Sequence, residues 1–294
     1  MRRARQLRLS MSCIIHIINT VVKPILLYGC EIFCYENICD LEAFYVQLLK
    51  RILYVKKSTT SFMVYAETGC EPLWVDIYKR ATCFWVKISQ DNTNLLANKL
   101  RSILIRIHEN TDYESPYITF MNKTFNDLGL TYMLFRESDI NQRKRDMRLI
   151  KSRIQDQYQQ QWQEKLFVSP KAIFYRMLKS EPGFEDYLDT LPFKKRIALT
   201  RFRLSSHRLP IETGRWYNID RHLRLCNFCH DNSLGDEFHY LFECTTFRDD
   251  RDRYLPKKFT RYPNAFKAYN LFKTNNQKTL NNLSYFVQII LSNF

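Results

Sequence analysis

One segment of the chain, Leu199–Leu255, reads LTRFRLSSHRLPIETGRWYNIDRHLRLCNFCHDNSLGDEFHYLFECTTFRDDRDRYL. Within it, Cys226, Cys229, His239 and Cys244 have the spacing C-x2-C-x9-H-x4-C. A gap of two residues lets a tight turn direct the first two thiols to one point, and the H-x4-C pair can complete a tetrahedron from the other side. Thiolate and imidazole are the usual ligands of Zn2+, and four protein ligands are typical of a structural zinc. The spacing therefore predicts a structural zinc site in this segment.

The two later ligands set a condition on the local structure. Asp236 can cap a short helix, DEFHYLF, that carries His239. Residues five apart do not share one face of an α-helix, so this helix must end or distort just before Cys244. Two other interpretations stay open: His230 is a rival ligand next to Cys229, or the cysteines are reduced, buried side chains around a core histidine.

The flank that precedes the cysteines is strongly basic. Between Lys194 and Arg224 the chain has nine Lys and Arg residues and two acids, and Phe202 and His207 are interleaved with them. Because cations neutralise phosphates and aromatic rings stack on bases, the flank is predicted to bind nucleic acid. The candidate contacts are Arg201, Arg203, Arg208, Arg215, Trp216, Tyr217 and Arg224. For any single arginine, the alternative is an ordinary solvated helix face.

Composition restricts the class of protein. A chain of 294 residues with 45% apolar and 15% aromatic residues can form about two folded domains. Six glycines argue against a Gly-rich nucleotide-binding fold, and a net charge of +15 favours an anionic partner. Nine cysteines is an odd number, and three belong to the predicted zinc site. In a long chain with apolar periodicity the others are expected to be reduced, which favours the nucleus or cytoplasm over secretion.

The first 22 residues imitate a signal peptide, with a basic start and an apolar run. His16, Asn19 and Lys23 interrupt that run, and no small-x-small cleavage site follows. The run is also too short and too polar to span a bilayer. We therefore expect no secretion and no membrane partner, while attachment to a membrane surface through residues 14–29 stays open as an alternative.

Helical periodicity dominates the chain, and few stretches alternate with period two, so the predicted fold class is mainly α. The longest helix is expected over 139–167, where a narrow apolar stripe suits a bridge between subdomains. We place the domain boundary after it, giving a helical domain over 1–167 and a basic helical region with the zinc module over 168–294. Further helices are expected over 12–34 with a turn at Lys23-Pro24, and over 41–54, 61–69, 72–90, 94–108, 116–128, 170–179, 184–190 and 193–206.

Two parts of the sequence resemble reverse transcriptases of animal non-LTR retrotransposons. The runs LTRFRLSSHRLPIETGRW, RLCNFC and DEFHYLFEC resemble their C-terminal zinc-binding region and occur in the same order. VVKPILLYGCEIF, at Val21–Phe33, and the later LLKRILYVKKSTTSFMVYAETGCEPL resemble the thumb and the start of the linker, which follow the polymerase palm. The resemblance covers about residues 15–90 and 195–255. It implies a helical thumb and linker domain followed by a CCHC module, with a role in gripping template RNA and target DNA.

No catalytic residue is predicted. Phe247–Asp250 reads FRDD and is similar to the F-x-D-D of reverse-transcriptase palms, where paired carboxylates on a β-hairpin hold Mg2+. Here no apolar strand flanks it, so a solvated turn or a helix start is expected. The family's palm precedes VVKPILLYG, and we expect this chain to be a C-terminal fragment of an RNA-directed DNA polymerase that lacks the palm. It is expected to bind nucleic acid, RNA or DNA, to be inactive alone and to take no small-molecule substrate.

The alternative function belongs to another class. The chain could be a domesticated protein-interaction adaptor, in which zinc only stabilises the fold and the amphipathic helices bind a partner protein. The positive charge would then be incidental.

Overall fold

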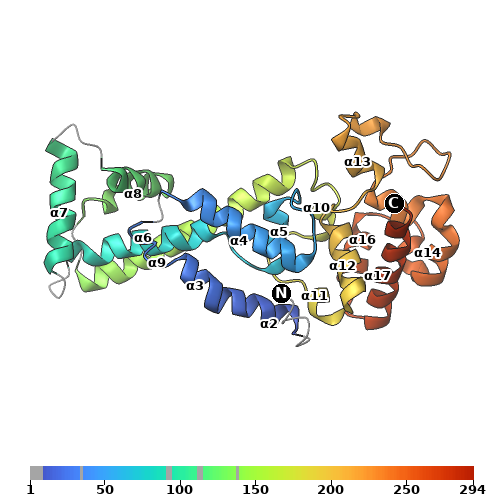
Figure 1. Cartoon of the computed structure of the whole chain (residues 1–294), viewed down its shortest axis with the longest axis horizontal. Helices are drawn as coiled ribbons and strands as arrows, with labels where there is room; N and C mark the ends of the chain where they lie inside the picture. Colours follow the sequence, from blue (N-terminus) through green and yellow to red (C-terminus); the bar gives the residue numbers. More distant parts are fainter. Residues whose placement is uncertain (1–8, 34–35, 91–94, 111–114, 137–138) are drawn as a thin grey trace. The chain divides into compact units, whose positions relative to one another are not determined.

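The computed structural model describes residues 9–33, 36–90, 95–110, 115–136 and 139–294 (Figure 1). Helices dominate these residues, and the extended pairings among them are two isolated β-bridges, Thr68–Phe184 and Leu225–Leu234. The prediction of a mainly α fold is confirmed. Within the described ranges, no helix is both long and apolar enough to cross a membrane. The basic residues 1–8, which begin the signal-peptide-like segment, lie outside the described residues.

The chain divides into two compact units, each built from separated segments. The C-terminal unit contains residues 1–16, 46–70 and 163–294, and the inserted unit contains residues 17–45 and 71–162. The chain passes for the last time from the inserted unit to the C-terminal unit after residue 162, close to the boundary predicted after residue 167. However, the segment 46–70 belongs with the C-terminal residues, so the division differs from the predicted 1–167 and 168–294.

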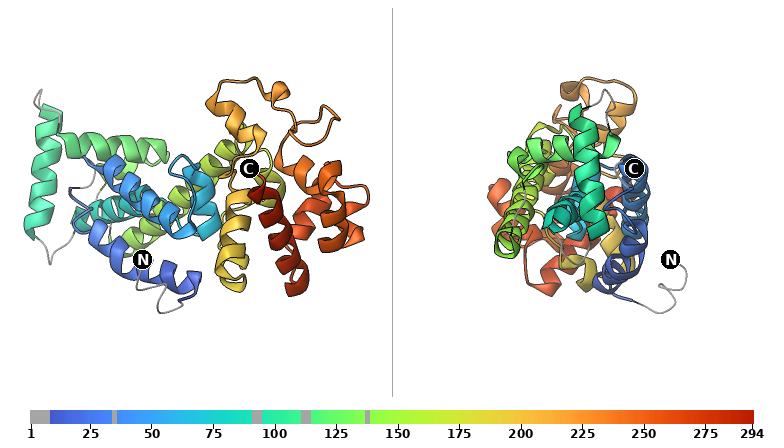
Figure 2. Two further views of the ribbon diagram at one scale, coloured as in Figure 1. Left: turned by 45° about the vertical axis from the view of Figure 1, so that its right-hand side comes forward. Right: turned by 90° about the vertical axis from the view of Figure 1, so that its left-hand side faces the viewer.

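The α-helices of the C-terminal unit come from all three of its segments. Its helices are most of α2 (Met11–Ile17), the second half of α4 (Ile38–Leu53), α5 (Ser61–Thr68), α10 (Tyr175–Leu178), α11 (Tyr187–Thr190), α12 (Phe193–Arg203), α13 (Pro210–Trp216), α14 (Arg248–Tyr254), α15 (Lys257–Thr260), α16 (Ala265–Phe272) and α17 (Gln277–Ser292). Helices α12 and α17 lie side by side in Figure 1 and in the left view of Figure 2. Near them, the buried ring of Phe174 packs edge-on against Phe202 and Phe272, with centroids 5.6 and 5.8 Å away.

A buried ion cluster connects the segment 46–70 to the C-terminal helices. Glu67 of α5 accepts a hydrogen bond from Arg203 Nε of α12 at 2.6 Å and another from the Tyr187 hydroxyl at 2.6 Å. Arg203 Nη2 also lies 3.1 Å from a carboxylate oxygen of Glu185, which pairs with Lys179 at 2.6 Å. Because a buried carboxylate requires a compensating cation, these contacts fix which helix Glu67 can pack against. This long-range pairing explains why the structure does not follow the predicted domain division.

The inserted unit contains short and long helices around an aromatic core. They are η1 (Ile18–Val22), α3 (Lys23–Leu26), the first half of α4, α6 (Leu73–Lys87), η2 (Ile88–Gln90), α7 (Leu95–Asn110), α8 (Pro116–Asp127), η3 (Thr131–Met133) and most of α9 (Ile140–Val168). The buried Trp85 donates its Nε1–H to the Leu134 carbonyl at 2.9 Å. The apolar stripe of α9 is buried from Ile150 to Leu166, as its periodicity predicts, whereas Ile140 at the start is exposed.

Several predicted helices differ in detail from the structure. Five residues of π-helix, η1, precede Pro24, and α3 starts directly after them. A wider turn is accommodated here because Pro24 has no N–H to donate to the regular hydrogen bonds of an α-helix. The helix expected over 170–179 shortens to α10, and Asn94, the expected start of α7, lies outside the described residues.

Candidate metal centre and basic face

Cys226, Cys229, His239 and Cys244 form a cluster that can hold a metal ion. One ligand atom from each lies within 4.8 Å of every other. The Sγ atoms of Cys226 and Cys244 are 3.8 Å apart, and Sγ of Cys229 is 3.3 Å from Nε2 of His239. Three of the side chains are buried and Cys226 is partly buried. The structure therefore brings together the four residues that the sequence predicted as ligands.

A short hairpin positions the first two cysteines. Leu225 and Leu234 pair as an antiparallel bridge, and the Cys226 N–H donates to the Ser233 carbonyl at 2.8 Å. The bridge closes the loop that carries Cys229. Gly235 is needed directly after it, since a Cβ there would lie 2.9 Å from Pro210 Cβ and Cγ.

A π-turn positions the last two ligands. Asp236 accepts a hydrogen bond from the His239 N–H at 2.9 Å, so it caps this short helical segment as predicted. The chain then forms a π-helix over His239–Glu243, η5, and the Cys244 N–H donates to the His239 carbonyl at 2.8 Å. This bond spans five residues instead of four, so the wider turn brings residues 239 and 244 toward the same side. The predicted distortion just before Cys244 is confirmed.

The three thiols interact strongly through charge. Burial would raise the pKa of Cys226, but hydrogen bonds from the N–H groups of Cys229 and Phe228 and from the Tyr240 hydroxyl lower it to about 6. Burial and, to a smaller degree, the nearby Cys226 together raise the pKa of Cys229 to about 11. Burial also raises the pKa of the Cys244 thiol. Cys226 therefore ionises easily, whereas Cys229 and Cys244 do not. A bound dication would favour ionisation of all three thiols, because it compensates their negative charges.

The second nitrogen of the His239 imidazole faces a carboxylate. Nε2 faces Cys229, while Nδ1 lies 3.5 Å from an oxygen of Glu243, one turn further along η5. Nδ1 is buried and makes no hydrogen bond within the described part of the chain, so the contact with the half-exposed Glu243 is long. Metal-binding histidines commonly direct their other N–H to a carboxylate, which fixes the ring and its tautomer. Glu243 is the residue placed to do this here.

The predicted nucleic-acid contacts divide between the surface and the interior. Arg201 and Arg208 are exposed, as are Trp216 and Tyr217 at the end of α13. Arg215 pairs with Glu212 at 3.0 Å and is partly buried. Arg224 crosses α13 at Gly214 and donates to backbone carbonyls of the same helix region. Phosphate contacts by the arginines other than Arg203 stay predictions.

The prediction that Arg203 contacts phosphate is wrong. Its side chain is 0% exposed and pairs with Glu67 and Glu185 in the buried cluster. Phe202 and His207, which the sequence placed among the aromatics of this face, are also buried. The imidazole of His207 accepts from the Leu209 N–H at Nδ1, so Nε2 carries the proton and donates to the Glu237 carboxylate at 2.9 Å. Basic and aromatic residues of one helix therefore serve the core as well as the surface.

The structure adds two lysines that sequence reasoning did not include in this face. Lys56, which follows α4, places Nζ 4.5 Å from the centroid of the Trp216 ring and donates to the His207 carbonyl at 2.6 Å. Lys171 contributes a further positive charge near Lys56. Lys56 and Lys57 follow the helix expected over 41–54, and only folding brings Lys56 to Trp216. We call Lys56, Lys171, Arg201, Arg208, Arg215, Trp216 and Tyr217 the basic face.

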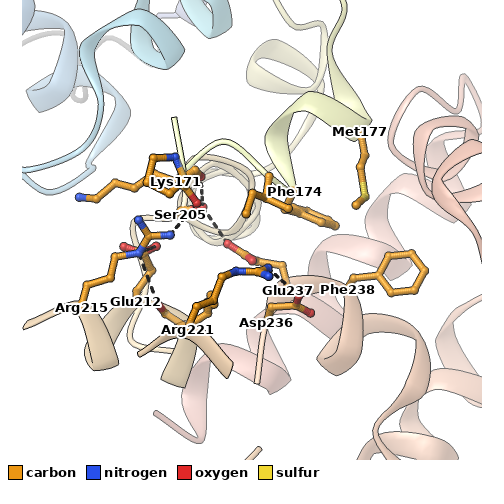
Figure 3. A pocket seen from close by; sticks show the side chains of 13 residues that line it. Lys171, Phe174, Met177, Ser205, Glu212, Arg215, Arg221, Asp236, Glu237 and Phe238 are labelled. Atoms are coloured by element: carbon orange, nitrogen blue, oxygen red, sulfur yellow. Dashed lines mark hydrogen bonds and ion pairs between the residues drawn. The ribbon is translucent and has the colours of Figure 1, made fainter. Parts of the chain in front are cut away.

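A small pocket lies between α10, α13 and the segment that leads into the metal cluster (Figure 3). Two ion pairs and a buried hydrogen bond line it. Arg215 contacts Glu212 at 3.0 Å, Arg221 lies 3.7 Å from Asp236, and the Ser205 hydroxyl donates to Glu237 at 2.7 Å. The contact between Arg221 and Asp236 joins the chain after α13 to the segment that leads into the metal cluster. Asp249 and Asp250 of the FRDD run lie in the first turn of α14, which confirms the predicted helix start.

Comparisons of the chain with known protein families, with curated proteins and with solved structures find no match.

Proposed function

We propose that the cysteine and histidine cluster binds a structural Zn2+ ion. In a tetrahedral site, Zn–S bonds of about 2.3 Å and Zn–N bonds of about 2.0 Å place two sulfurs about 3.8 Å apart and a sulfur and a nitrogen about 3.5 Å apart. The distances of 3.8 Å between Cys226 and Cys244 and 3.3 Å between Cys229 and His239 suit this geometry. Four protein ligands complete the coordination, so the ion would stabilise the fold and leave no open position for catalysis.

Zinc binding is tested by metal analysis of the purified protein and of a Cys226→Ser variant. We expect about one zinc per chain in the unaltered protein and loss of the metal in the variant, since the serine hydroxyl is a poor zinc ligand at neutral pH. Amide hydrogen exchange should increase in residues 225–244 of the variant. Cys39→Ser, which alters an exposed cysteine of the inserted unit, is the control. Protein purified with zinc present that binds no metal would rule out the site.

The chain itself is best accounted for as a nucleic-acid-binding part of a non-LTR retrotransposon reverse transcriptase, namely the thumb, linker and CCHC module that follow the palm. One observation supports this most directly: the four ligands follow, in one compact unit, a face with exposed arginines and aromatics. A net charge of +15 gives such a face long-range attraction for phosphate. Binding would use phosphate contacts from Arg201, Arg208 and Arg215.

Salt dependence tests nucleic-acid binding. The affinity of the zinc-loaded protein for labelled RNA and DNA is measured by fluorescence anisotropy at several salt concentrations. Each phosphate contact contributes about one to the slope of log affinity against log salt. Arg208→Ala should therefore lower the slope by about one, while Arg253→Ala, which removes an exposed arginine on α14, should leave it unchanged. Affinity that does not depend on salt would contradict the proposal.

A protein-interaction adaptor is the second candidate, and one observation in the inserted unit favours it. Ile25 and Tyr28 are 71% and 89% exposed, which is unusual for apolar side chains so close together. If this surface binds a protein, a purified complex should resist nuclease and dissociate when Ile25 and Tyr28 are replaced by serine. A complex that nuclease destroys would instead favour nucleic acid as the bridging partner.

A further inference from the structure

We propose that Trp216, Tyr217 and Lys56 form a site for unpaired nucleotides, so that the basic face prefers a single strand of RNA or DNA to a duplex. This inference rests on the proposed nucleic-acid binding and specifies the form of the ligand. In the site, bases stack on the two aromatic rings while Lys56 and Arg208 contact the neighbouring phosphates.

The two aromatic side chains are available for stacking. Trp216 is 52% exposed and Tyr217 is 75% exposed, and they are adjacent at the end of α13. The other tryptophans of the chain, Trp74, Trp85 and Trp162, are buried or partly buried. About half of the Trp216 surface is not packed against the fold and can contact a ligand.

The turn that carries these rings is braced. Arg224 donates from Nε to the Ile219 carbonyl at 2.8 Å and from Nη1 to the Ile211 carbonyl at 3.0 Å. Its side chain passes directly over Gly214, where a Cβ would lie only 2.5 Å from Arg224 Cγ. The Ile219 N–H also donates to the Gly214 carbonyl at 2.8 Å, which closes the end of the helix. Because the turn is already held in place, binding of a ligand loses less conformational entropy there.

Lys56 is held beside the indole by contacts at both ends of the residue. Its backbone N–H donates to the Ser206 hydroxyl at 2.9 Å, and its Nζ donates to the His207 carbonyl at 2.6 Å. The ammonium then lies 4.5 Å from the centroid of the Trp216 ring, so it covers one face and leaves the rest of the exposed ring open. A phosphate attached to a base stacked on Trp216 would therefore lie within reach of a fixed positive charge.

The surrounding cations lack enough acids to compensate them. Burial lowers the pKa of Lys56, and Arg208, Arg201 and Lys171 lower it further, while Glu212 opposes them. Glu212 is itself buried and paired with Arg215 at 3.0 Å. Arg208 is exposed and makes no hydrogen bond or ion pair among the described residues. An anionic phosphate would relieve this repulsion, which favours binding of a phosphodiester next to the rings.

The geometry discriminates against a duplex because paired bases are stacked on each other. Only the edges of paired bases are accessible in the grooves, whereas an unpaired base offers its whole face to an aromatic ring. Two adjacent exposed rings would thus add affinity for a single strand and none for a duplex. The phosphate contacts act on both forms, so the preference should depend on the rings and the general affinity on the cations.

Binding of oligo-dT, alone and annealed to oligo-dA, is measured on the zinc-loaded full chain by fluorescence anisotropy and by quenching of tryptophan emission. We expect oligo-dT to bind more tightly than the duplex and to quench Trp216. Because a base that stacks on the indole loses this contact, Trp216→Ala should weaken oligo-dT binding about tenfold and duplex binding little. Trp216→Phe, which keeps a stacking surface, should recover most of the loss.

Two matched variants control for general effects. Phe266→Ala removes an exposed aromatic of the same unit on α16 and should change neither affinity. Lys258→Met removes an ammonium that lies 4.8 Å from the centroid of a buried ring, Phe259, where no base can stack. It should leave binding unchanged, whereas Lys56→Met should weaken oligo-dT binding several-fold.

The possible outcomes separate this inference from the proposed function. Tighter binding of the single strand that Trp216→Ala abolishes would support the inference. Equal, salt-dependent binding of both forms that Trp216→Ala does not change would overturn it and leave nucleic-acid binding intact. Binding of neither form would overturn both.

Discussion

Replacing Arg203 with methionine should strongly destabilise the C-terminal unit. The guanidinium is fully buried and donates to Glu67 at 2.6 and 3.2 Å, and it lies 3.1 Å from Glu185. Methionine has a similar length but no charge. Glu185 would keep Lys179 at 2.6 Å and Lys273 at 2.8 Å, whereas Glu67 would keep only hydroxyl groups as partners.

The expected loss follows from the carboxylate that remains. Removing one partner of a buried ion pair costs about 3–5 kcal/mol, because the other charge stays buried without compensation. Domains are stable by about 5–15 kcal/mol, so this is a large fraction of the total. Lys273→Met provides the control within the same cluster. Its side chain is 38% exposed and Glu185 keeps two other cations, so we expect a loss below about 1 kcal/mol.

The assay has to report on the C-terminal unit alone, since the chain has two units. Native-state hydrogen exchange of amides in α5 and α12 gives the free energy of opening of the helices that the cluster connects. The double variant Glu67→Gln with Arg203→Met should recover part of the loss, because the neutral amide can still accept from Tyr187. An Arg203→Met variant whose α5 and α12 amides exchange as slowly as in the unaltered protein would show that the cluster does not connect the segments.

Three further predictions concern pH, a glycine and the metal. Burial raises the pKa of Glu185, but its cation partners lower it overall, from the ordinary 4.5 to about 2. The lowered pKa stabilises the fold fully above pH 4.5, so urea titrations should show that the free energy of unfolding falls by about 3 kcal/mol as the pH falls toward 2. A free energy of unfolding that stays constant over this pH range would exclude the effect. Gly214→Ala should displace Arg224 from the carbonyls of Ile219 and Ile211 and destabilise the C-terminal unit by about 1–2 kcal/mol in urea unfolding. An unaltered urea midpoint would mean that the Arg224 side chain can move aside without loss. Glu243→Gln should weaken zinc binding about tenfold in a chelator competition, since it weakens the contact at 3.5 Å with His239 Nδ1. Asp249→Asn, which alters an exposed carboxylate, is the control and should leave zinc binding unchanged.

The sequence predicted the features that depend on near neighbours in the chain. Apolar periodicity is a local property, so the helical class and the buried face of α9 follow from it. The ligand spacing predicted both the metal cluster and the distortion before Cys244, because a separation of five positions between His239 and Cys244 excludes a regular helix with both side chains inward. Asp236 was found by the same local reasoning, since a capping side chain acts on the next few N–H groups.

Tertiary packing alone fixes the features that join distant segments. Arg203 and Arg201 lie two residues apart in one basic run, yet Arg203 is buried and Arg201 is exposed, because α12 presents one face to Glu67 and the other to solvent. Nothing near Arg203 in sequence reveals a carboxylate 136 residues away. In the same way Lys56 joins Trp216 only when the segment 46–70 packs against the C-terminal helices. The sequence therefore shows how many charges a segment carries, whereas the partner of each charge depends on which helix faces pack against each other.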